Sequence, residues 1–551
     1  MLVINKIKIF IKSNYLIILI LLLAFVLRVW GVTYGLPGLF VGDEKSIVGG
    51  AMKMMYQKNI FPVLEPDIFR LLYYPTLIPW VLLIFFVPWF ILVYMSGNFS
   101  SLSNLRDYFV LNPESFFLIG RVVNVFFSVA VVYLIYAIAK KIFSYRAGLL
   151  AALIYAVSWL PIHQGHFVKH WNVGGFFALL ALYFAINILK NPSWRNYILT
   201  GIFIGLAGAT DYIHVLYGVF LAMFHFLFLK LSFKEKIFSC KFWVGVAISL
   251  AIFIFGIITY PQEFYRIAFG EDSTTTAVKS LVGFWQVIGE MFFTLYYLET
   301  VLLFLSLVGG LILFFKNKKL FFSFILIPIL APFLYYFLLH FEPRYVLLFL
   351  PILAMLAGFG LDQVIKILKI KSIFLLIILC FLVIFLPLKN ALVFDKMLTQ
   401  TDTRILAQKW IESNLPSDSK IITNSWEFNL TRNSKCIYDQ QQTNNSSLRS
   451  RDYIMWDKNI SDGYCVWPLD LILSLPKNMG EYQYYVIDSY TTRRSYYLGE
   501  ELMPRTELVK EFSGSAYNII ENIPADFIGK LLVDKKAVGP DVKIYKLNTI
   551  K

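Results

Sequence analysis

Long apolar runs alternate with short polar segments over most of the chain. The first run, 15–34, is long enough to cross a bilayer, which takes about 20 helical residues. It lacks a cleavage site of small residues, so we expect a retained helix and not a signal peptide. The pattern predicts eleven membrane-spanning helices. They fall near 15–34, 116–139, 147–162, 171–189, 197–211, 212–229, 241–260, 299–315, 320–339, 346–362 and 372–388.

The pattern changes from residue 389 onward, where Asn, Ser, Asp and Lys occur throughout. Short apolar stretches at 484–490 and 542–547 predict strands. Apolar residues at helical spacing predict a helix within 402–416, which Pro416 ends. The chain therefore divides into a transmembrane domain over 1–388 and an external soluble α/β domain over 389–551.

Composition supports the membrane assignment. Apolar residues make up 58% of the 551 residues and charged residues only 15%, with a mean hydropathy of +0.65. A soluble core could not bury so much hydrophobic surface. We expect a multi-pass membrane protein.

The net charge of +15 comes largely from short loops between the apolar runs. Six such segments together hold eighteen Lys and Arg and two acidic residues: 1–14, 140–146, 190–196, 230–241, 316–319 and 362–371. Basic loops are retained on the cytoplasmic side, which explains this charge better than nucleic-acid binding does. The N-terminus is then cytoplasmic and the C-terminal domain extracytoplasmic.

The apolar run at 75–95, PTLIPWVLLIFFVPWFILVYM, is the exception in this count. A single crossing here would move every later basic loop to the outer side. Its three prolines also disfavour one regular helix, because an interior proline removes a backbone hydrogen bond and clashes with the preceding turn. We therefore expect a re-entrant or interfacial helix inside one large outer loop, 35–115.

Four cysteines bear on the compartment. Cys240 and Cys380 lie at or within the membrane, whereas Cys436 and Cys465 lie in the external domain, where oxidation is possible. The sequence leaves open whether Cys436 and Cys465 are bridged.

Ionisable groups on the predicted outer side gather at four places. They are Arg28 with Asp43 and Glu44; HQGHFVKHWN (163–172), which contains Lys169 and three histidines; 263–276, which contains Glu271 and Asp272; and HFEPRY (340–345). Ionisable groups near a bilayer cost free energy, so their presence indicates a function. The alternative explanation is that they only snorkel to water or solvate the ends of helices. The acids Glu271 and Asp272 are expected only to solvate a loop.

A carboxylate that faces cations at a lipid surface suits transfer of a group from a lipid phosphate to an acceptor hydroxyl. The carboxylate takes the hydroxyl proton, and Arg or Lys holds the leaving phosphate. Arg344 offers planar two-point contacts to phosphate, and Lys169 a point charge. Neither a dinucleotide fingerprint nor a P-loop occurs in the sequence.

Four segments, in the order in which they follow one another along the chain, resemble the GT-C glycosyltransferases. They are GLPGLFVGDE (35–44), GRVVNVFFSVAVVYLIYAIAKKIFSYRAGLLAALIYAVSWLPIHQGHF (120–167), FEPRYVLLFLPILAMLAGFG (341–360) and DTRILAQKWIESNLP (402–416). The chain is most similar to the branch that contains protein O-mannosyltransferases and the enzyme that transfers aminoarabinose to lipid A. The resemblance implies a GT-C-like fold over the membrane part and an inverting transferase that uses a polyprenyl-phosphate sugar. With it we expect a multi-pass protein of the plasma (inner) membrane of a prokaryote.

The resemblance also suggests site residues. Asp43 corresponds to the catalytic base, with Glu44 expected to orient Asp43 or the acceptor. Arg344 and Tyr345 are expected at the donor phosphate, together with Lys169 and Arg28. Three further residues, His166, His170 and Asn172, are expected in the second outer loop, near the acceptor.

The chain departs from this family at two places. Where many relatives carry a second Asp, it has His170 or Asn172, and where relatives often carry Lys it has Asp211. No metal cofactor is expected, because the histidines at 163, 166 and 170 lack the spacing with an acid that helical zinc sites use.

Two other functions remain as alternatives. A transporter or flippase of lipid-linked sugars also needs basic and aromatic groups near headgroups, but it places ionisable residues at the bilayer midplane and has paired broken helices. A receptor would not require eleven helices or the acid pair. The expected partners of a transferase are the lipid-linked donor and a lipid, glycan or protein acceptor. The sequence does not specify the sugar.

Overall fold

The computed structural model describes residues 2–69, 72, 74–262, 264–265, 281–338, 341–424, 428–444, 454–455, 458, 461–472, 474–490, 502–503, 506–514 and 538–548. Most of the predicted ionisable segment 263–276, including Glu271 and Asp272, lies outside these residues, as does His340.

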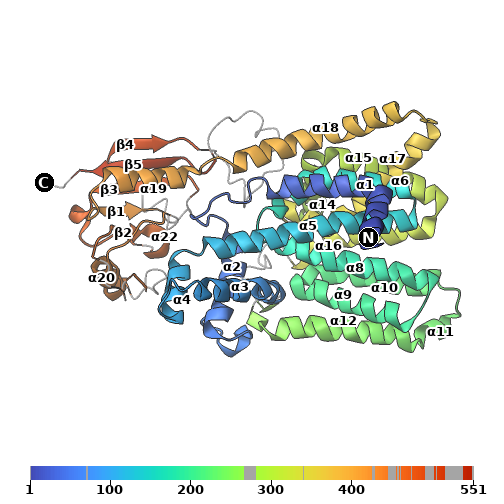
Figure 1. Cartoon of the computed structure of the whole chain (residues 1–551), viewed down its shortest axis with the longest axis horizontal. Helices are drawn as coiled ribbons and strands as arrows, with labels where there is room; N and C mark the ends of the chain where they lie inside the picture. The colour runs from blue at the N-terminus through green and yellow to red at the C-terminus, as the bar shows by residue number, and fades with distance from the viewer. Residues whose placement is uncertain are drawn as a thin grey trace.

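Most of the chain forms one helical bundle (Figure 1). Its main helices are α1 (Leu2–Val29), α5 (Glu114–Ile142), α6 (Tyr145–Val157), α7 (Trp159–Gly165), α8 (His170–Lys190), α9 (Trp194–Thr210), α12 (Cys240–Ile258), α14 (Leu281–Leu298), α15 (Thr300–Lys316), α16 (Lys318–Leu338), α17 (Leu350–Ile367) and α18 (Ile373–Leu398). Short helical segments also contribute: η2 (Tyr212–Tyr217), α10 (Gly218–Met223) and η3 (Phe224–Phe228) follow α9, and η4 (Pro343–Leu348) precedes α17.

Seven of the helices in the described part are long and apolar enough to cross a membrane, or up to nine if each bent pair counts as one span. The predicted class, a multi-pass helical membrane protein, is confirmed. Each predicted span overlaps a helix or a run of short helices. The number eleven itself stays a prediction.

Two of the helical pairs are bent. α6 and α7 meet at 60°, and α14 and α15 meet at 113°. Glu299 lies between α14 and α15, and its Oε1 accepts a hydrogen bond of 2.8 Å from the backbone N–H of Leu160, in the first turn of α7. A helix start leaves such N–H groups without intrahelical partners, so Glu299 satisfies one of them. The sequence pattern did not predict α14.

The segment 75–95 forms one uninterrupted helix, α3 (Leu77–Met95). Pro79 lies in its first turn, where a missing N–H costs no hydrogen bond, and Pro88 is accommodated inside. One helix therefore forms over these residues, although its prolines disfavour a regular helix. α3 packs against α2 (Gly42–Gln57), and both lie with α4 (Leu102–Leu111) at the end of the bundle that carries the sheet (Figure 1). That α3 is re-entrant or interfacial stays a prediction.

The C-terminal part forms a five-stranded sheet in the order β2-β1-β3-β5-β4. Its strands are β1 (Lys420–Thr423), β2 (Cys465–Pro468), β3 (Tyr484–Asp488), β4 (Thr506–Phe512) and β5 (Val542–Leu547). β1 is parallel to β2 and β3, and β5 is antiparallel to β3 and β4. Helix α19 (Thr403–Asn414) packs on the sheet through Ala407 and Ile411. The α/β domain, its two predicted strands and its predicted helix are confirmed.

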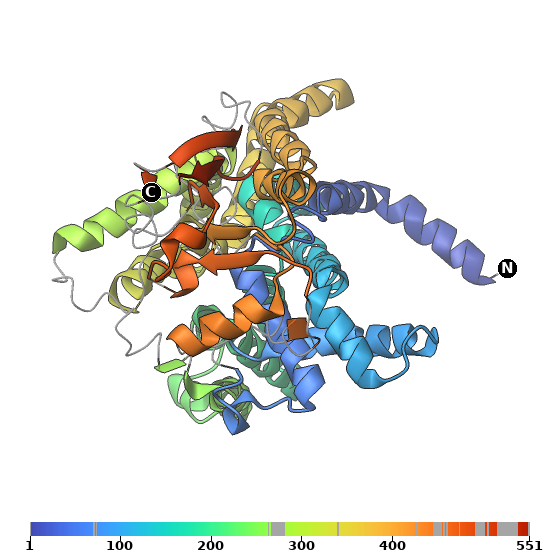
Figure 2. The same ribbon diagram turned by 90° about the vertical axis from the view of Figure 1, so that its left-hand side faces the viewer.

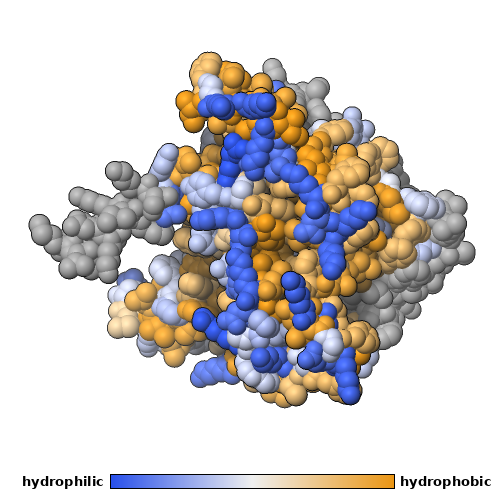
Figure 3. All heavy atoms as spheres, turned by 90° about the vertical axis from the view of Figure 1, so that its right-hand side faces the viewer, coloured by the Kyte–Doolittle hydropathy of each residue, from blue (hydrophilic) through white to orange (hydrophobic). Residues whose placement is uncertain are grey.

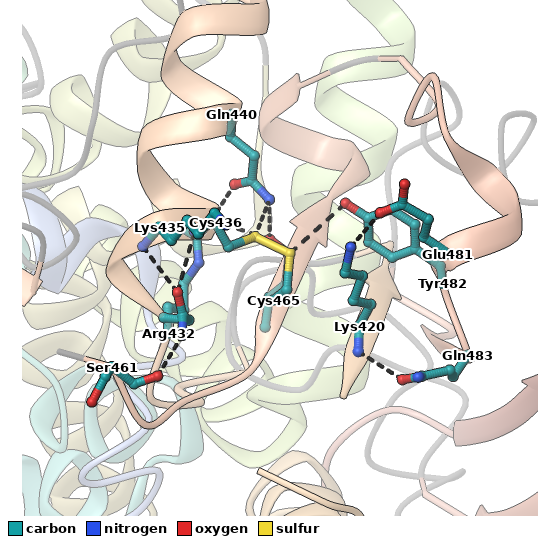
Figure 4. Close-up of a disulfide and its surroundings, with 12 residues drawn as sticks. Lys420, Arg432, Lys435, Cys436, Gln440, Ser461, Cys465, Glu481, Tyr482 and Gln483 are labelled. Carbon is teal, nitrogen blue, oxygen red and sulfur yellow. Dashed lines mark hydrogen bonds and ion pairs between the residues drawn. A yellow bond between two sulfur atoms is a disulfide. The ribbon is translucent and has the colours of Figure 1, made fainter. Parts of the chain in front are cut away.

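The sheet domain carries the disulfide that the sequence left open. Cys436 in α20 (Ser434–Asn444) is bonded to Cys465 in β2, across a sequence separation of 29 (Figure 4). Gln440 Nε2 donates to Cys436 Sγ at 3.3 Å and to the Val466 carbonyl at 2.7 Å. Cys240 and Cys380 are free.

The two ends of the bundle differ. The N-terminus and α11 (Phe233–Ile237), both within segments predicted to be cytoplasmic, lie at the end opposite the sheet domain (Figure 1). Hydrophilic side chains cross this end face between apolar ones (Figure 3). At the other end the sheet domain covers the bundle, and α18 continues past the predicted boundary at Leu388 to Leu398 before α19 begins (Figure 2).

Candidate functional site

Asp43 lies in the first turn of α2. Helix α2 lies at the end of the bundle that faces the sheet domain (Figure 1). A carboxylate is favourable there because the N-terminus of a helix carries partial positive charge. Tyr74 donates a hydrogen bond of 2.8 Å to Oδ1. Oδ2 accepts from both Lys169 and Arg344. The Asp43 side chain keeps 21% of its surface exposed, so it remains open to a ligand.

The surroundings of Asp43 keep it ionised. Burial alone would raise the pKa of this carboxyl, but attraction to Lys169 and Arg344 and the hydrogen bonds from Lys169 and Tyr74 outweigh it. The pKa of Asp43 therefore lies well below its ordinary value. In this state Asp43 is a charged hydrogen-bond acceptor whose affinity for a proton is low.

The two cations come from separate parts of the chain. Lys169 is fully buried in the loop that precedes α8, and Arg344 belongs to η4. The Arg344 guanidinium reaches Asp43 through one terminal nitrogen at 3.1 Å, and its Nε lies 2.7 Å from Glu342 Oε2. Burial lowers the pKa of Arg344, but Asp43 and the other neighbouring acidic groups raise it above its ordinary value. Asp43 thus contacts both cations, and Glu342 contacts Arg344.

An aromatic wall lies beside Arg344. The ring of Tyr345 packs 5.5 Å from Trp171 and 5.2 Å from Tyr335, measured between centroids. Tyr335 also donates a hydrogen bond of 2.7 Å to the Tyr345 carbonyl. Tyr345, predicted at the donor phosphate, therefore lies next to the cation expected to hold that phosphate.

Glu44 lies in the interior of the protein, although it follows the partly exposed Asp43 directly in the sequence. It is completely buried and accepts two hydrogen bonds from Arg121, at 2.9 and 2.7 Å, and one from the Val168 N–H at 2.7 Å. Arg121 also donates to the carbonyls of Val32 and Tyr34, each at 2.7 Å. The contacts of Glu44 join α2 to the backbone next to Lys169. The expectation that Glu44 orients Asp43 or the acceptor stays a prediction.

Three other predicted residues lie inside the bundle. Arg28 is fully buried and donates to Ser128 and to backbone carbonyls of α1 and α6, and none of its described contacts is with Asp43. His166 contacts two backbone carbonyls and lies 3.4 Å from Asp395. Asn172 donates to the Gln164 carbonyl at 2.9 Å. Their described polar contacts thus lie within the bundle, and their roles at the donor phosphate and the acceptor stay predictions.

His170 does lie beside the site. Its ring packs on Tyr74, with centroids 4.7 Å apart, and its Nε2 lies 3.5 Å from Asp211 Oδ2. His214 Nδ1 approaches the same oxygen at 3.2 Å. Gly174 makes room for His214, because a Cβ there would lie 2.9 Å from the imidazole Nδ1.

Sequence reasoning missed Tyr74 and Arg121. An arginine inside the predicted span 116–139 is a signal that would have indicated Arg121, since a charge there needs a partner. Tyr74 lies among many similar aromatic residues and gives no such signal.

Within the described ranges, no group of three or more His, Cys, Asp and Glu side chains is arranged to hold a metal ion.

The site and the fold together define a multi-pass membrane protein with a carboxylate held between two cations at one end of its bundle. Residues 116–258 match the family model described as dolichyl-phosphate-mannose-protein mannosyltransferase. Over these residues, the predicted resemblance to the protein O-mannosyltransferases is confirmed. No match was found among the curated proteins.

Solved structures also show similarity. The apo oligosaccharyltransferase of Archaeoglobus fulgidus is 13% identical, with 91% of this chain and 73% of that one covered and a TM-score of 0.49. ArnT from Cupriavidus metallidurans bound to undecaprenyl phosphate is 10% identical, with 91% and 96% covered and a TM-score of 0.42. Apo ArnT is 10% identical, with 99% and 98% covered and a TM-score of 0.43.

Proposed function

We propose that this protein is an inverting glycosyltransferase that moves a sugar from a polyprenyl-phosphate donor to an acceptor hydroxyl at the outer face of the plasma membrane. The observation that carries the proposal is the Asp43 carboxylate, which is partly exposed between Lys169 and Arg344 at the end of the bundle. The matched family is described by its use of dolichyl-phosphate mannose. In this proposal the donor sugar is a hexose or a pentose, and the acceptor a glycan, lipid or protein.

The reaction assigns one task to each charged group. The acceptor oxygen attacks the anomeric carbon from the side opposite the phosphate, and its proton passes to Asp43. The bond between the anomeric carbon and the phosphate oxygen breaks, and the electron pair leaves with the phosphate. Lys169 and Arg344 stabilise the negative charge that develops there. Attack from the opposite side inverts the anomeric configuration.

Donor binding would also prepare the base. While Lys169 and Arg344 contact Asp43, they keep its pKa low and make it a weak proton acceptor. A donor phosphate that draws both cations toward its own oxygens removes part of this attraction. The pKa of Asp43 then rises toward its ordinary value, and Tyr74 still holds Oδ1 in place. The base becomes effective only when the donor is present.

The test is transfer of labelled sugar from defined undecaprenyl-phosphate hexoses and pentoses to an envelope extract of the source cells, with the protein in nanodiscs. We expect Asp43→Asn to reduce turnover at least about 100-fold, in the range of a general base, while donor binding persists. Asp418→Asn, at an exposed position of the external domain, is the matched control and should transfer like the parent. Parental turnover by the Asp43→Asn protein would remove this carboxylate from the mechanism.

Flipping of lipid-linked sugars is the second candidate function, and the two bent helical pairs favour it, because broken helices occur in transporters. Proteoliposomes with the donor in both leaflets distinguish the two functions. A flippase moves the lipid intact without an acceptor, whereas a transferase releases bare polyprenyl phosphate only when an acceptor is added.

We further propose that the N-terminus is cytoplasmic and the sheet domain extracytoplasmic. The support is the excess of Lys and Arg in the six basic segments. This orientation places Asp43 where an outer-leaflet phosphate and an external acceptor meet.

A further inference from the structure

Four buried polar atoms without a described hydrogen-bond partner gather around Asp211, between α9 and η2. They are Asp211 Oδ2, His214 Nδ1, His170 Nδ1 and Trp171 Nε1. The imidazole nitrogens of His170 and His214 lie 3.5 and 3.2 Å from Asp211 Oδ2, without well-aligned hydrogen-bond geometry. Buried polar groups are nearly always satisfied in folded proteins, so such a concentration indicates a place where a ligand supplies the missing partners.

The cluster adjoins the Asp43 site. His170 packs on Tyr74, which holds Asp43, and Trp171 packs on Tyr345, next to Arg344. The Trp171 ring also contacts both imidazoles, with centroids 4.8 and 5.8 Å away. His170 and His214 are at least nine-tenths buried, whereas Asp211 keeps 15% of its side chain exposed. A ligand bound between Lys169 and Arg344 would therefore extend toward Asp211.

The charges indicate which part of a ligand would lie there. A carboxylate repels phosphate, and the cations lie on the Asp43 side. Hydroxyl groups both donate and accept, so they can satisfy a carboxylate oxygen, an imidazole nitrogen and an indole N–H together. Aromatic side chains with a few converging polar groups are the usual lining of a small-molecule subsite.

We propose that Asp211, with His170, His214 and Trp171, binds the hydroxyl groups of the donor sugar while Lys169 and Arg344 hold its phosphate. This subsite rests on the proposed function, because it deepens the same donor site. It assigns Asp211 to recognition of the sugar and not of the lipid.

The test compares two ligands in nanodiscs: undecaprenyl phosphate alone, and the undecaprenyl-phosphate sugar that the parent protein transfers best among hexoses and pentoses. We expect Asp211→Asn to weaken binding of the sugar-bearing lipid about tenfold or more, the scale of one lost hydrogen bond to a charged group, and to leave the bare lipid unchanged. His214→Asn should show the same selectivity, and Asp418→Asn should change neither affinity.

Equal weakening of both lipids by Asp211→Asn and His214→Asn, in proteins with the parental unfolding temperature, would overturn the sugar subsite. Unchanged affinity for both lipids with a raised KM for the acceptor would overturn it too, because the hydroxyls would then belong to the acceptor. A parent protein that binds neither lipid would instead contradict the proposed function itself. The two failures are therefore distinguishable.

Discussion

Replacing Glu44 by Gln tests whether Glu44 contributes to the stability of the fold while Asp43 contributes to catalysis. Both Glu44 and Arg121 are completely buried, and Arg121 directs two nitrogens at the two carboxylate oxygens. Gln keeps the shape of Glu and one oxygen that can accept a hydrogen bond from Arg121. Its NH2 group, however, is a donor that faces the second donor nitrogen of the guanidinium. The variant therefore contains a buried cation without a counter-charge.

The expected cost is about 3–5 kcal/mol of stability, the range for removal of one partner from a buried ion pair. Asp43→Asn should cost less. Asp43 is partly exposed, and Arg344 retains its contact with Glu342. We therefore expect Glu44→Gln to lower the unfolding temperature clearly more than Asp43→Asn, and Asp43→Asn to lower turnover more per folded molecule.

Differential scanning fluorimetry in detergent measures the first quantity, and transfer per correctly folded molecule the second. Combining Glu44→Gln with Arg121→Met should recover part of the lost stability, since the unpaired charge is gone, although contacts to Val32 and Tyr34 are lost as well. A Glu44→Gln protein that melts like the parent and does not transfer would refute this reasoning and make Glu44 a catalytic residue.

Two further predictions concern the donor and the topology. Arg344→Lys keeps the charge but cannot form a bidentate phosphate contact, so donor affinity should fall about 10- to 100-fold, roughly 1.4–2.7 kcal/mol; unchanged affinity would remove Arg344 from the donor site. In a Cys240→Ser background, cysteines at the exposed positions Asn98 and Ser417 should react with an impermeant thiol reagent from outside, and one at Asn317 should not. Reaction at position 98 only after permeabilisation would mean that α3 crosses the membrane.

The sequence determined the class of protein and most of its helices, because the thickness of a bilayer sets how long a membrane-spanning apolar run must be. The charge of each loop predicts on which side of the membrane that loop lies. It also predicted that Asp43, Lys169 and Arg344 share one membrane face, since parity assigns their loops to the same side. The strands at 484–488 and 542–547 were readable because their apolar residues stand out in a polar region.

Only the tertiary structure separated Asp43 from Glu44. Adjacent residues of a helix point about 100° apart, so one carboxylate faces Lys169 and Arg344 while the other meets Arg121 on α5. Which neighbour lies in each direction depends on how α2 packs against the bundle, and no local pattern encodes that. The same holds for Asp211, whose histidines come from two separate elements. Long-range packing decides which charges are paired and which remain open to a ligand.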